Sequence, residues 1–302
     1  IFLEKVLHIS KNSCIFAKVL AFTAPFYQPT KYKKDMKTRI LFTLLICNIF
    51  ASQLFAQMPN YDGSPLEYDE SFTRKKVGDA KVSDLAEISG MVCSRVTPGY
   101  LWVQGDDSYK VRAMTPEGTF TTTIKLHNTY RDWEGLSGGV YNDTNYLFVG
   151  VFGDNGLSYK DKYYIYYFAE PEVVDGEVTV EKKIIHFGYP DHKAHNAEVI
   201  MYDNIEEKIY IVDKWNTFNS TGMVYSMPFS TDMNLDTMQV LTEECQLGGS
   251  DMYVLTPDGK KAGLFQNPTG GDISPDGKYI MIKNEAFMLI WTRESVDGQL
   301  ES

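Results

Sequence analysis

The sequence predicts an all-β fold, because short aromatic and β-branched runs recur along it and almost no stretch has helical periodicity. The runs are nearly continuously apolar, which indicates strands covered on both faces. They are YLWVQ at 100–104, YLFVGVF at 146–152, YYIYYF at 163–168, KIYIVD at 208–213 and KYIMIK at 278–283. Tight-turn sequences separate them: TPEG at 115–118, YNDTN at 141–145, TPDGK at 256–260 and SPDGK at 274–278.

A two-stranded unit recurs four times, each time with the same order of features. An acidic residue opens a small or apolar strand, a turn follows, and a second strand ends at Asp or Asn. The opening and closing residues are Glu87 and Asp106, Glu134 and Asp154, Glu198 and Asp213, and Asp272 and Asn284. A further β-rich stretch follows each unit. Repeated units of three or four strands are typical of a β-propeller.

The first strand of each propeller blade lines the central channel, so the opening acids would form a ring at one mouth. The stretch TYRDWEGLSGGV at 129–140 illustrates this, with Asp132 and Glu134 directly before an apolar strand. Burying an unpaired carboxylate is costly, so we expect both side chains at a solvated rim. A β-sandwich is the alternative fold, but it does not explain why an acid recurs at the start of each unit.

The N-terminal region predicts export. Residues 36–56 combine Lys37 and Arg39, a short apolar run and a small residue at Ala56, which is the pattern of a signal peptide. The apolar run is too short to span a bilayer as a helix, so no transmembrane anchor is predicted. We therefore expect a secreted or periplasmic protein with a non-native upstream extension at 1–35, a polar lead-in at 57–82 and one propeller domain at 83–302.

The charge of the chain limits its possible binding partners, and its cysteine content limits its possible disulfides. Residues 1–56 hold eight of the 29 Lys and Arg and two of the 40 Asp and Glu, so the remaining chain has a net charge of −17. A strongly acidic surface repels phosphate backbones, which argues against a nucleic acid partner. Cys93 and Cys245 remain after processing and allow at most one disulfide. Neither the pairing of these cysteines nor the oligomeric state follows from the sequence.

The acid ring predicts a site for calcium or another hard divalent cation. Calcium takes six to eight oxygen ligands, and separate blades can each supply one or two. The candidate metal ligands are Glu87, Asp132, Glu134, Asp154, Glu198 and Asp272. The alternative is that these residues cap strand ends or solvate the rim. The GLSGG motif around Ser137 is better explained as small residues in an inner strand, because no helix follows it.

The same mouth is a candidate site for a small molecule or a cell-surface component. Polar and aromatic side chains next to the acids are the candidate ligand-binding residues: Asp106, Asn155, Asn196, Trp133, Asp213, Trp215 and His195. Most of the abundant tyrosines are expected to fill interfaces between blades, whereas Trp133 and Trp215 adjoin predicted rim residues. The alternative function is a metal-dependent hydrolase of esters, lactones or phosphates.

Five motifs resemble a known group of proteins: EISGM, DWEGL, GDNG, HNAEV and GGDISPDGKYIMIKN. They are similar to secreted bacterial TolB-like six-bladed β-propellers, nearest to the SdiA-regulated and esterase-like phytase groups. The resemblance covers about residues 84–293 and implies a ring of five or six blades. It implies little about chemistry, because these groups mix cation-dependent hydrolases with proteins of no assigned activity. Relatives continue with a further blade, whereas this chain stops eleven residues after Trp291. Either the lead-in at 57–82 closes the ring with the last blade, or the chain is truncated at its C-terminus, which is the alternative that we favour.

Overall fold

The computed structural model confirms an all-β fold. It describes residues 5–8, 76–80, 85, 87–106, 109–126, 132–214, 222–247, 253–255, 261–263, 267–284, 287–296 and 299–301. These residues form strands, turns and irregular segments, and none of them is helical. It follows that this part of the chain contains no helix with the length and apolar character needed to cross a membrane.

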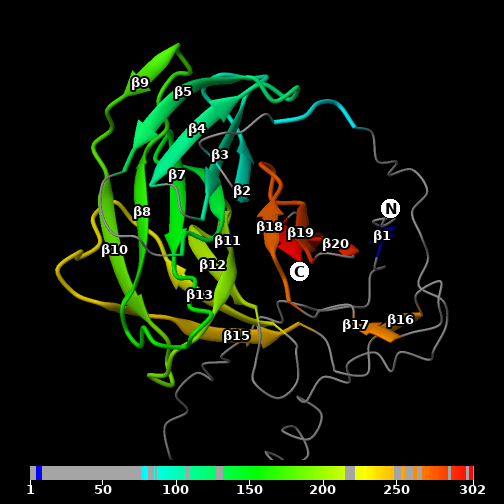
Figure 1. The fold of residues 1–302 in the computed structure, drawn as a ribbon. Coiled ribbons are helices and arrows are strands. Elements are labelled where there is room, and N and C mark those ends of the chain that lie inside the picture. The colour runs from blue at the N-terminus through cyan, green and yellow to red at the C-terminus, as the bar shows by residue number, and fades with distance from the viewer. Residues whose placement is uncertain are drawn as a thin grey trace, which may run out of the picture.

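Four sheets radiate from a common axis and form a β-propeller (Figure 1). Blade 1 contains β2 (Ile88–Cys93), β3 (Leu101–Gly105), β4 (Lys110–Met114), β5 (Phe120–Lys125) and β9 (Gly176–Val178). Blade 2 contains β6 (Leu136–Tyr141), β7 (Thr144–Val151), β8 (Tyr163–Ala169), β10 (Lys183–Gly188) and β14 (Gln239–Val240). Blade 3 contains β11 (Ala197–Asp203), β12 (Lys208–Asp213), β13 (Met223–Pro228) and β15 (Thr242–Gln246). Blade 4 contains β18 (Gly270–Ile273), β19 (Tyr279–Lys283), β20 (Phe287–Thr292) and β1 (Lys5–His8).

Two short hairpins complete the described strands. They are β16 (Tyr253–Leu255) with β17 (Lys261–Gly263), and β21 (Glu294–Val296) with β22 (Gln299–Glu301). The structure thus describes four blades, against the five or six that the resemblance implies. The strand β1 falls in the segment that we expect to be an upstream extension, and it pairs in parallel with β20.

The four predicted repeats correspond to the inner strands of the four blades. Each repeat is an antiparallel pair: β2 with β3, β6 with β7, β11 with β12, and β18 with β19. The innermost strands β2, β6, β11 and β18 lie next to one another around the axis. Asn142 and Asp143 both have positive φ, at 46° and 59°, as a tight hairpin turn requires. The predicted turn at 256–260 lies outside the described residues.

Strand exchange joins neighbouring blades. The strand β9 comes from the connection after β8, yet it pairs in parallel with β5 of blade 1. The strand β14 comes from the connection after β13 and pairs in parallel with β10 of blade 2. Each exchanged strand covers an edge that would otherwise expose unpaired backbone groups.

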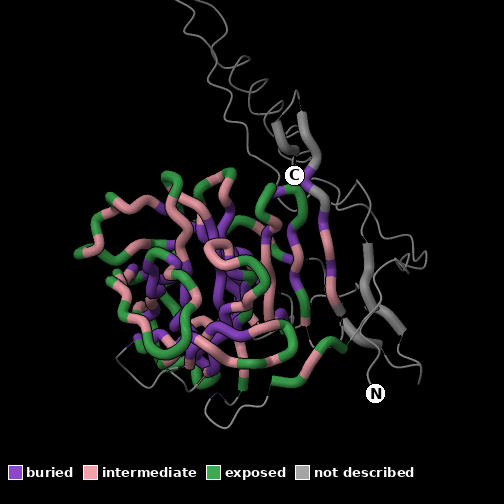
Figure 2. Tube along the Cα trace, turned by 90° about the horizontal axis from the view of Figure 1, so that it is seen from above, coloured by how far each residue is buried: buried purple, intermediate pink, exposed green. Residues whose placement is uncertain are grey.

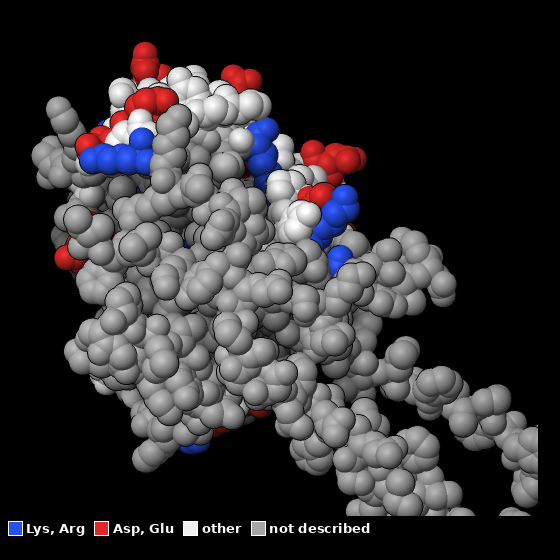
Figure 3. All heavy atoms as spheres, turned by 90° about the vertical axis from the view of Figure 1, so that its right-hand side faces the viewer, with Lys and Arg blue, Asp and Glu red and all other residues white. Residues whose placement is uncertain are grey.

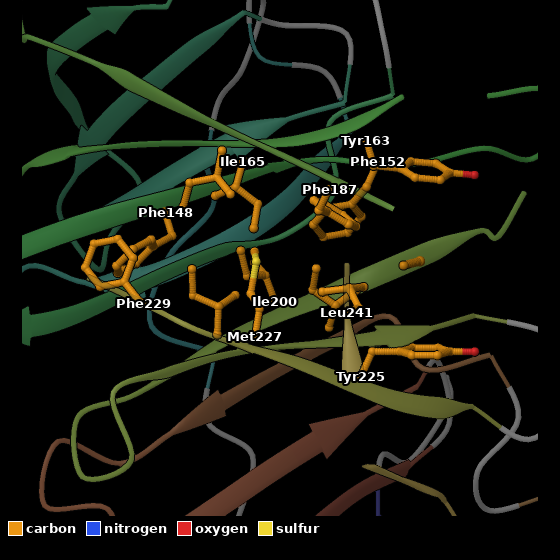
Figure 4. Close-up of a cluster of buried hydrophobic side chains, with 14 of the residues drawn as sticks. Phe148, Phe152, Tyr163, Ile165, Phe187, Ile200, Tyr225, Met227, Phe229 and Leu241 are labelled. Atoms are coloured by element: carbon orange, nitrogen blue, oxygen red, sulfur yellow. The ribbon is translucent and has the colours of Figure 1, made fainter. Parts of the chain in front are cut away.

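Many residues of the blade strands are buried, as the purple parts of the chain trace in Figure 2 show. Between blades 2 and 3, Phe148, Ile165 and Phe187 face Met227 and Phe229 (Figure 4). Other buried clusters lie between blades 1 and 2 and between blades 3 and 4. Many tyrosines take part in this packing, as expected for interfaces between blades. Cys93 and Cys245 are both free.

Gly139 on β6 allows blades 2 and 3 to approach closely, which gives a first prediction. A Cβ atom there would overlap Cδ1 of the Tyr202 ring, in a packed interface. Gly139→Ala should therefore reduce the free energy of unfolding by about 1–3 kcal/mol, as overpacked cores do. Urea denaturation measures this change. Gly156→Ala is the control, because its Cβ would meet only Ser158 Oγ, at 3.2 Å. Equal midpoints for the two variants would contradict this account of the interface.

Candidate functional site

An axial cavity of about 620 Å³ runs between the inner strands of all four blades. Its wall includes all four opening acids of the repeats, namely Glu87, Glu134, Glu198 and Asp272. Asp106 also lines it, as do two basic residues, Lys214 and Lys283. The structure therefore brings the recurring acids to one cavity, as the ring arrangement requires.

The backbone fixes the acidic end of this cavity. The Asp106 N–H donates to Glu87 O at 3.2 Å, and the Trp133 N–H donates to Asp106 O at 3.2 Å. These two bonds tie the end of β3 to the start of β2 and to the segment that leads into β6. Glu87 has a φ of 55°, a left-handed conformation that residues other than glycine rarely adopt.

Three carboxylates cluster at this end. One carboxylate oxygen each from Asp106, Asp132 and Glu134 lies within 4.8 Å of the others. Among the described residues, no other set of three His, Cys, Asp or Glu side chains has this spacing. Carboxylate oxygens are the ligands that calcium and magnesium prefer in proteins, so the donor set fits a hard divalent cation.

Glu134 is buried, and the expectation that it is solvated was wrong. Only 4% of it is exposed, and Ser89 of blade 1 and the charge of Glu198 of blade 3 act on its carboxyl. Burial, followed by the charge of Glu198, raises the pKa of the Glu134 carboxyl to about 9. Its Oε2 accepts a hydrogen bond from Ser89 Oγ at 2.5 Å. A proton therefore neutralises this group at neutral pH, which avoids the cost of a buried charge.

Asp106 and Asp132 are half-buried beside Glu134. Burial raises the pKa of Asp106 to about 6, and the negative charges of Asp132 and Glu87 act in the same direction. Among the described residues, its buried Oδ1 atom has no hydrogen-bond partner. A cation among these three side chains would relieve both the mutual repulsion and this missing contact.

Glu198 forms an ion pair that the sequence analysis did not predict. Lys214 Nζ donates to Glu198 Oε1. Although burial alone would lower the pKa of Lys214, the hydrogen bond and charge of Glu198 raise it, and Glu134 and Asp132 add to the effect. Lys214 is thus an internal cation of the acidic cavity. The only signal in the sequence was its position, one residue after a strand that ends at Asp213.

A chain of amide side chains connects blade 3 to Asp132. Asn155 Nδ2 donates to Asp132 Oδ2 at 3.1 Å, and Asn196 Nδ2 donates to Asn155 Oδ1 at 3.2 Å. Asn196 Oδ1 accepts the Asp154 N–H at 2.7 Å. Asn155 and Asn196 thus orient a carboxylate of the cluster across the interface between blades 2 and 3.

Asp154 does not join the cluster, contrary to the predicted metal role. Its carboxylate accepts the N–H groups of Ser158 and Tyr159 at 2.7 and 2.8 Å, and the Tyr163 hydroxyl at 3.1 Å. Its oxygens are therefore directed into its own loop, and Asp154 does not line the axial cavity.

His195 and Asp213 belong to a separate polar cluster. His195 Nδ1 lies 3.3 Å from Asp213 Oδ2, and Nε2 lies 3.0 Å from Asp191 Oδ1. The imidazole stacks on Tyr189 with 4.0 Å between ring centroids. Burial alone would lower the pKa of His195, but hydrogen bonds to Asp213 and Asp191 raise it. Neither His195 nor Asp213 lines the axial cavity.

Trp133 does not lie at the mouth, which corrects its predicted role in ligand stacking. It is 1% exposed and packs at 5.8 Å from the Tyr166 ring in the core between blades 1 and 2. Although Asp132 and Glu134 flank Trp133 in the sequence, the Trp133 ring packs in the core between blades. Trp215, the other predicted aromatic contact, lies outside the described residues.

Asp272 lies apart from the three-acid cluster, within the cavity wall. It is part of β18 and pairs in register with Met281 of β19. Burial raises the pKa of Asp272 to about 6, although the Ile273 N–H and the charge of Arg95 lower it. The cavity thus has an acidic mouth and a further carboxylate on the wall formed by blade 4.

Together the fold and the site define the class of protein, a β-propeller with an acidic axial cavity. No protein-family profile matches the chain, and no curated protein is similar to it in sequence. An auxiliary nutrient binding protein from Bacteroides thetaiotaomicron has a TM-score of 0.41 and 12% identity, over 72% of this chain and 41% of its own.

Two further solved structures are similar at this level. The Swd1 β-propeller domain from Myceliophteria thermophila has a TM-score of 0.36 and 10% identity, over 71% of this chain and 57% of its own. Hydrazine synthase from Kuenenia stuttgartiensis has a TM-score of 0.36 and 13% identity, over 65% and 61%. The chain spans less than two thirds of each of the three proteins. Similarity this low carries no argument about function.

Proposed function

We propose that this protein is an exported ligand-binding β-propeller that holds a divalent cation at the acidic end of its axial cavity. The observation that carries the proposal is the cluster of Asp106, Asp132 and Glu134, of which Asp106 and Glu134 line a cavity of about 620 Å³. This volume is in the range of sites for small molecules. The ligand is a small molecule or a cell-surface component.

Calcium suits the cluster better than a softer metal. All three side chains offer carboxylate oxygens, and the described residues near them add no His or Cys to the set. The remaining positions of a six- to eight-coordinate ion would be filled by water, carbonyl oxygens or the ligand. A bound cation would take the place of the proton that neutralises Glu134 in its absence.

Two further parts of the proposal are export, which rests on the signal-peptide pattern, and a partner other than nucleic acid, which rests on charge. Export is supported by the signal-peptide pattern at 36–56. Lys and Arg lie beside Asp and Glu on the described part of the face in Figure 3, without a broad basic area. This distribution, with the net negative charge, supports a partner other than nucleic acid.

Calcium titration followed by thermal denaturation tests the cation site. Calcium should raise the melting temperature of the wild type, because a ligand that binds only the folded state adds about 2.7 kcal/mol at a hundredfold excess over Kd. Asp132→Asn should lose most of this response, because it removes one charged ligand. The control is Asp143→Asn, in the β6–β7 turn, where asparagine tolerates the positive φ. The same calcium response in both variants, or none in the wild type, would rule out this site.

A further inference from the structure

The cavity wall beyond the acidic mouth is largely apolar. All four blades contribute, through Ile88 on β2, Leu136 on β6, Ile200 on β11 and Met281 on β19. A ligand that fills this space would remove apolar surface from water, which favours binding of a molecule with a hydrocarbon body.

Asp272 is the carboxylate within this wall. In the described part of the chain it accepts a hydrogen bond from the Ile273 N–H at 2.9 Å and has no ion-pair partner. Arg95 is near enough for its charge to act on Asp272, but its guanidinium Nη2 donates to Gly138 O at 3.0 Å. Arg95 therefore acts on Asp272 through its charge but forms no ion pair with it within the described structure.

Three buried carboxylates of this protein have ion-pair or side-chain hydrogen-bond partners, whereas the half-buried Asp272 has neither among the described residues. Asp203 is paired with Arg293, and Glu198 with Lys214. Glu170 accepts hydrogen bonds from Ser94 Oγ and Trp102 Nε1, and also from backbone N–H groups. A carboxylate taken out of water without a partner is costly, so a bound cation would stabilise the Asp272 carboxylate.

The occupant that fits is organic rather than a second metal ion. One carboxylate beside an apolar wall offers too few oxygens for calcium or magnesium, which need six or more ligands. An ammonium group needs few hydrogen-bond acceptors, and the hydrocarbon body attached to it would contact half-buried apolar lining residues such as Ile88 and Met281. An anionic ligand would instead face Asp272 and the acidic mouth, which opposes its entry.

We infer that the axial cavity binds a primary organic amine with an apolar body, whose ammonium group pairs with Asp272. The inference rests on the proposed function of the cavity as a ligand-binding site, and it names the chemical class of the ligand. The divalent cation and the amine occupy different parts of the cavity, so each can be tested without the other.

Isothermal titration calorimetry with three six-carbon probes in the presence of calcium tests this inference. Hexylamine should bind, hexan-1-ol should bind at least about tenfold more weakly, and hexanoate more weakly still, since one charged contact is commonly worth that factor. Asp272→Asn should weaken hexylamine binding by about the same factor and leave the calcium response unchanged. The control Asp276→Asn, in the exposed β18–β19 turn, should change neither.

The outcomes separate this inference from the proposed cation site. Equal affinity for hexylamine and hexan-1-ol in the wild type would overturn the inference, and this comparison does not depend on how any variant folds. Undiminished hexylamine binding to Asp272→Asn would also overturn it. Hexylamine binding that requires Asp272 in a protein without a calcium response would support the amine site and overturn only the cation site.

Discussion

Replacing Glu134 by glutamine is expected to make the metal-free protein more stable than the wild type at about pH 8. The folded-state pKa of Glu134, at about 9, lies far above the usual value of 4.5. Between these values the folded protein holds a proton that the unfolded chain releases. The contribution of this group to stability is therefore greatest below about pH 4.5 and decreases by up to about 1.4 kcal/mol per pH unit as the pH rises toward 9. Glutamine is neutral at every pH and removes this decrease.

Urea denaturation at several pH values, with and without calcium, measures the effect. Calcium should offset the loss of stability in the wild type at high pH, because the cation replaces the proton. It should do little for Glu134→Gln, which lacks the carboxylate. Glu117→Gln, in an exposed turn, is the control and should follow the wild type. A pH profile of Glu134→Gln parallel to that of the wild type would contradict a neutral, buried Glu134.

The sequence predicted the fold because local signals in each repeat agree with one another. Turn residues such as Asn142 and Asp143 determine where each hairpin reverses, and apolar runs determine which strands are covered on both faces. The acid that opens each repeat therefore occupies an equivalent position near the axis in every blade. The four opening acids, Glu87, Glu134, Glu198 and Asp272, thus line one cavity.

Side-chain environment was predicted less well, since it depends on contacts from other blades. Asp154 and Asp106 occupy equivalent positions after the second strand of a repeat. The loop after Asp154 offers two N–H groups and a tyrosine hydroxyl, so its carboxylate is directed there instead of toward the axis. Glu134 is buried beside segments of other blades, and Glu198 is paired with Lys214, which follows β12. A repeat pattern identifies equivalent backbone positions, whereas these differences arise from residues outside the pattern.

Replacing Asp203 by asparagine is expected to reduce the free energy of unfolding by about 3–5 kcal/mol, the range found when one partner of a buried ion pair is removed. Asp203 is fully buried at the end of β11, and Arg293 directly follows β20. Arg293 Nη1 lies 3.2 Å from Asp203 Oδ1, and Nη2 donates to Oδ2. Asparagine keeps an acceptor for the Ile205 N–H but leaves the buried guanidinium without its counter-charge.

Urea denaturation compares this variant with Glu177→Ala, which removes an exposed ion pair between Glu177 and Lys125. The exposed pair joins β9 to β5 and should contribute no more than about 1 kcal/mol. Similar losses in the two variants would contradict the importance of burial.

The double variant Asp203→Asn with Arg293→Met tests the reason for the loss. If an uncompensated charge is the cause, removing the guanidinium should restore part of the stability that Asp203→Asn loses. Additive losses would show that the two residues act independently. The ion pair links blade 3 to blade 4, and blade 4 carries Asp272 and Lys283 of the cavity wall. Asp203→Asn should therefore also weaken hexylamine binding, whereas the double variant should recover binding together with stability.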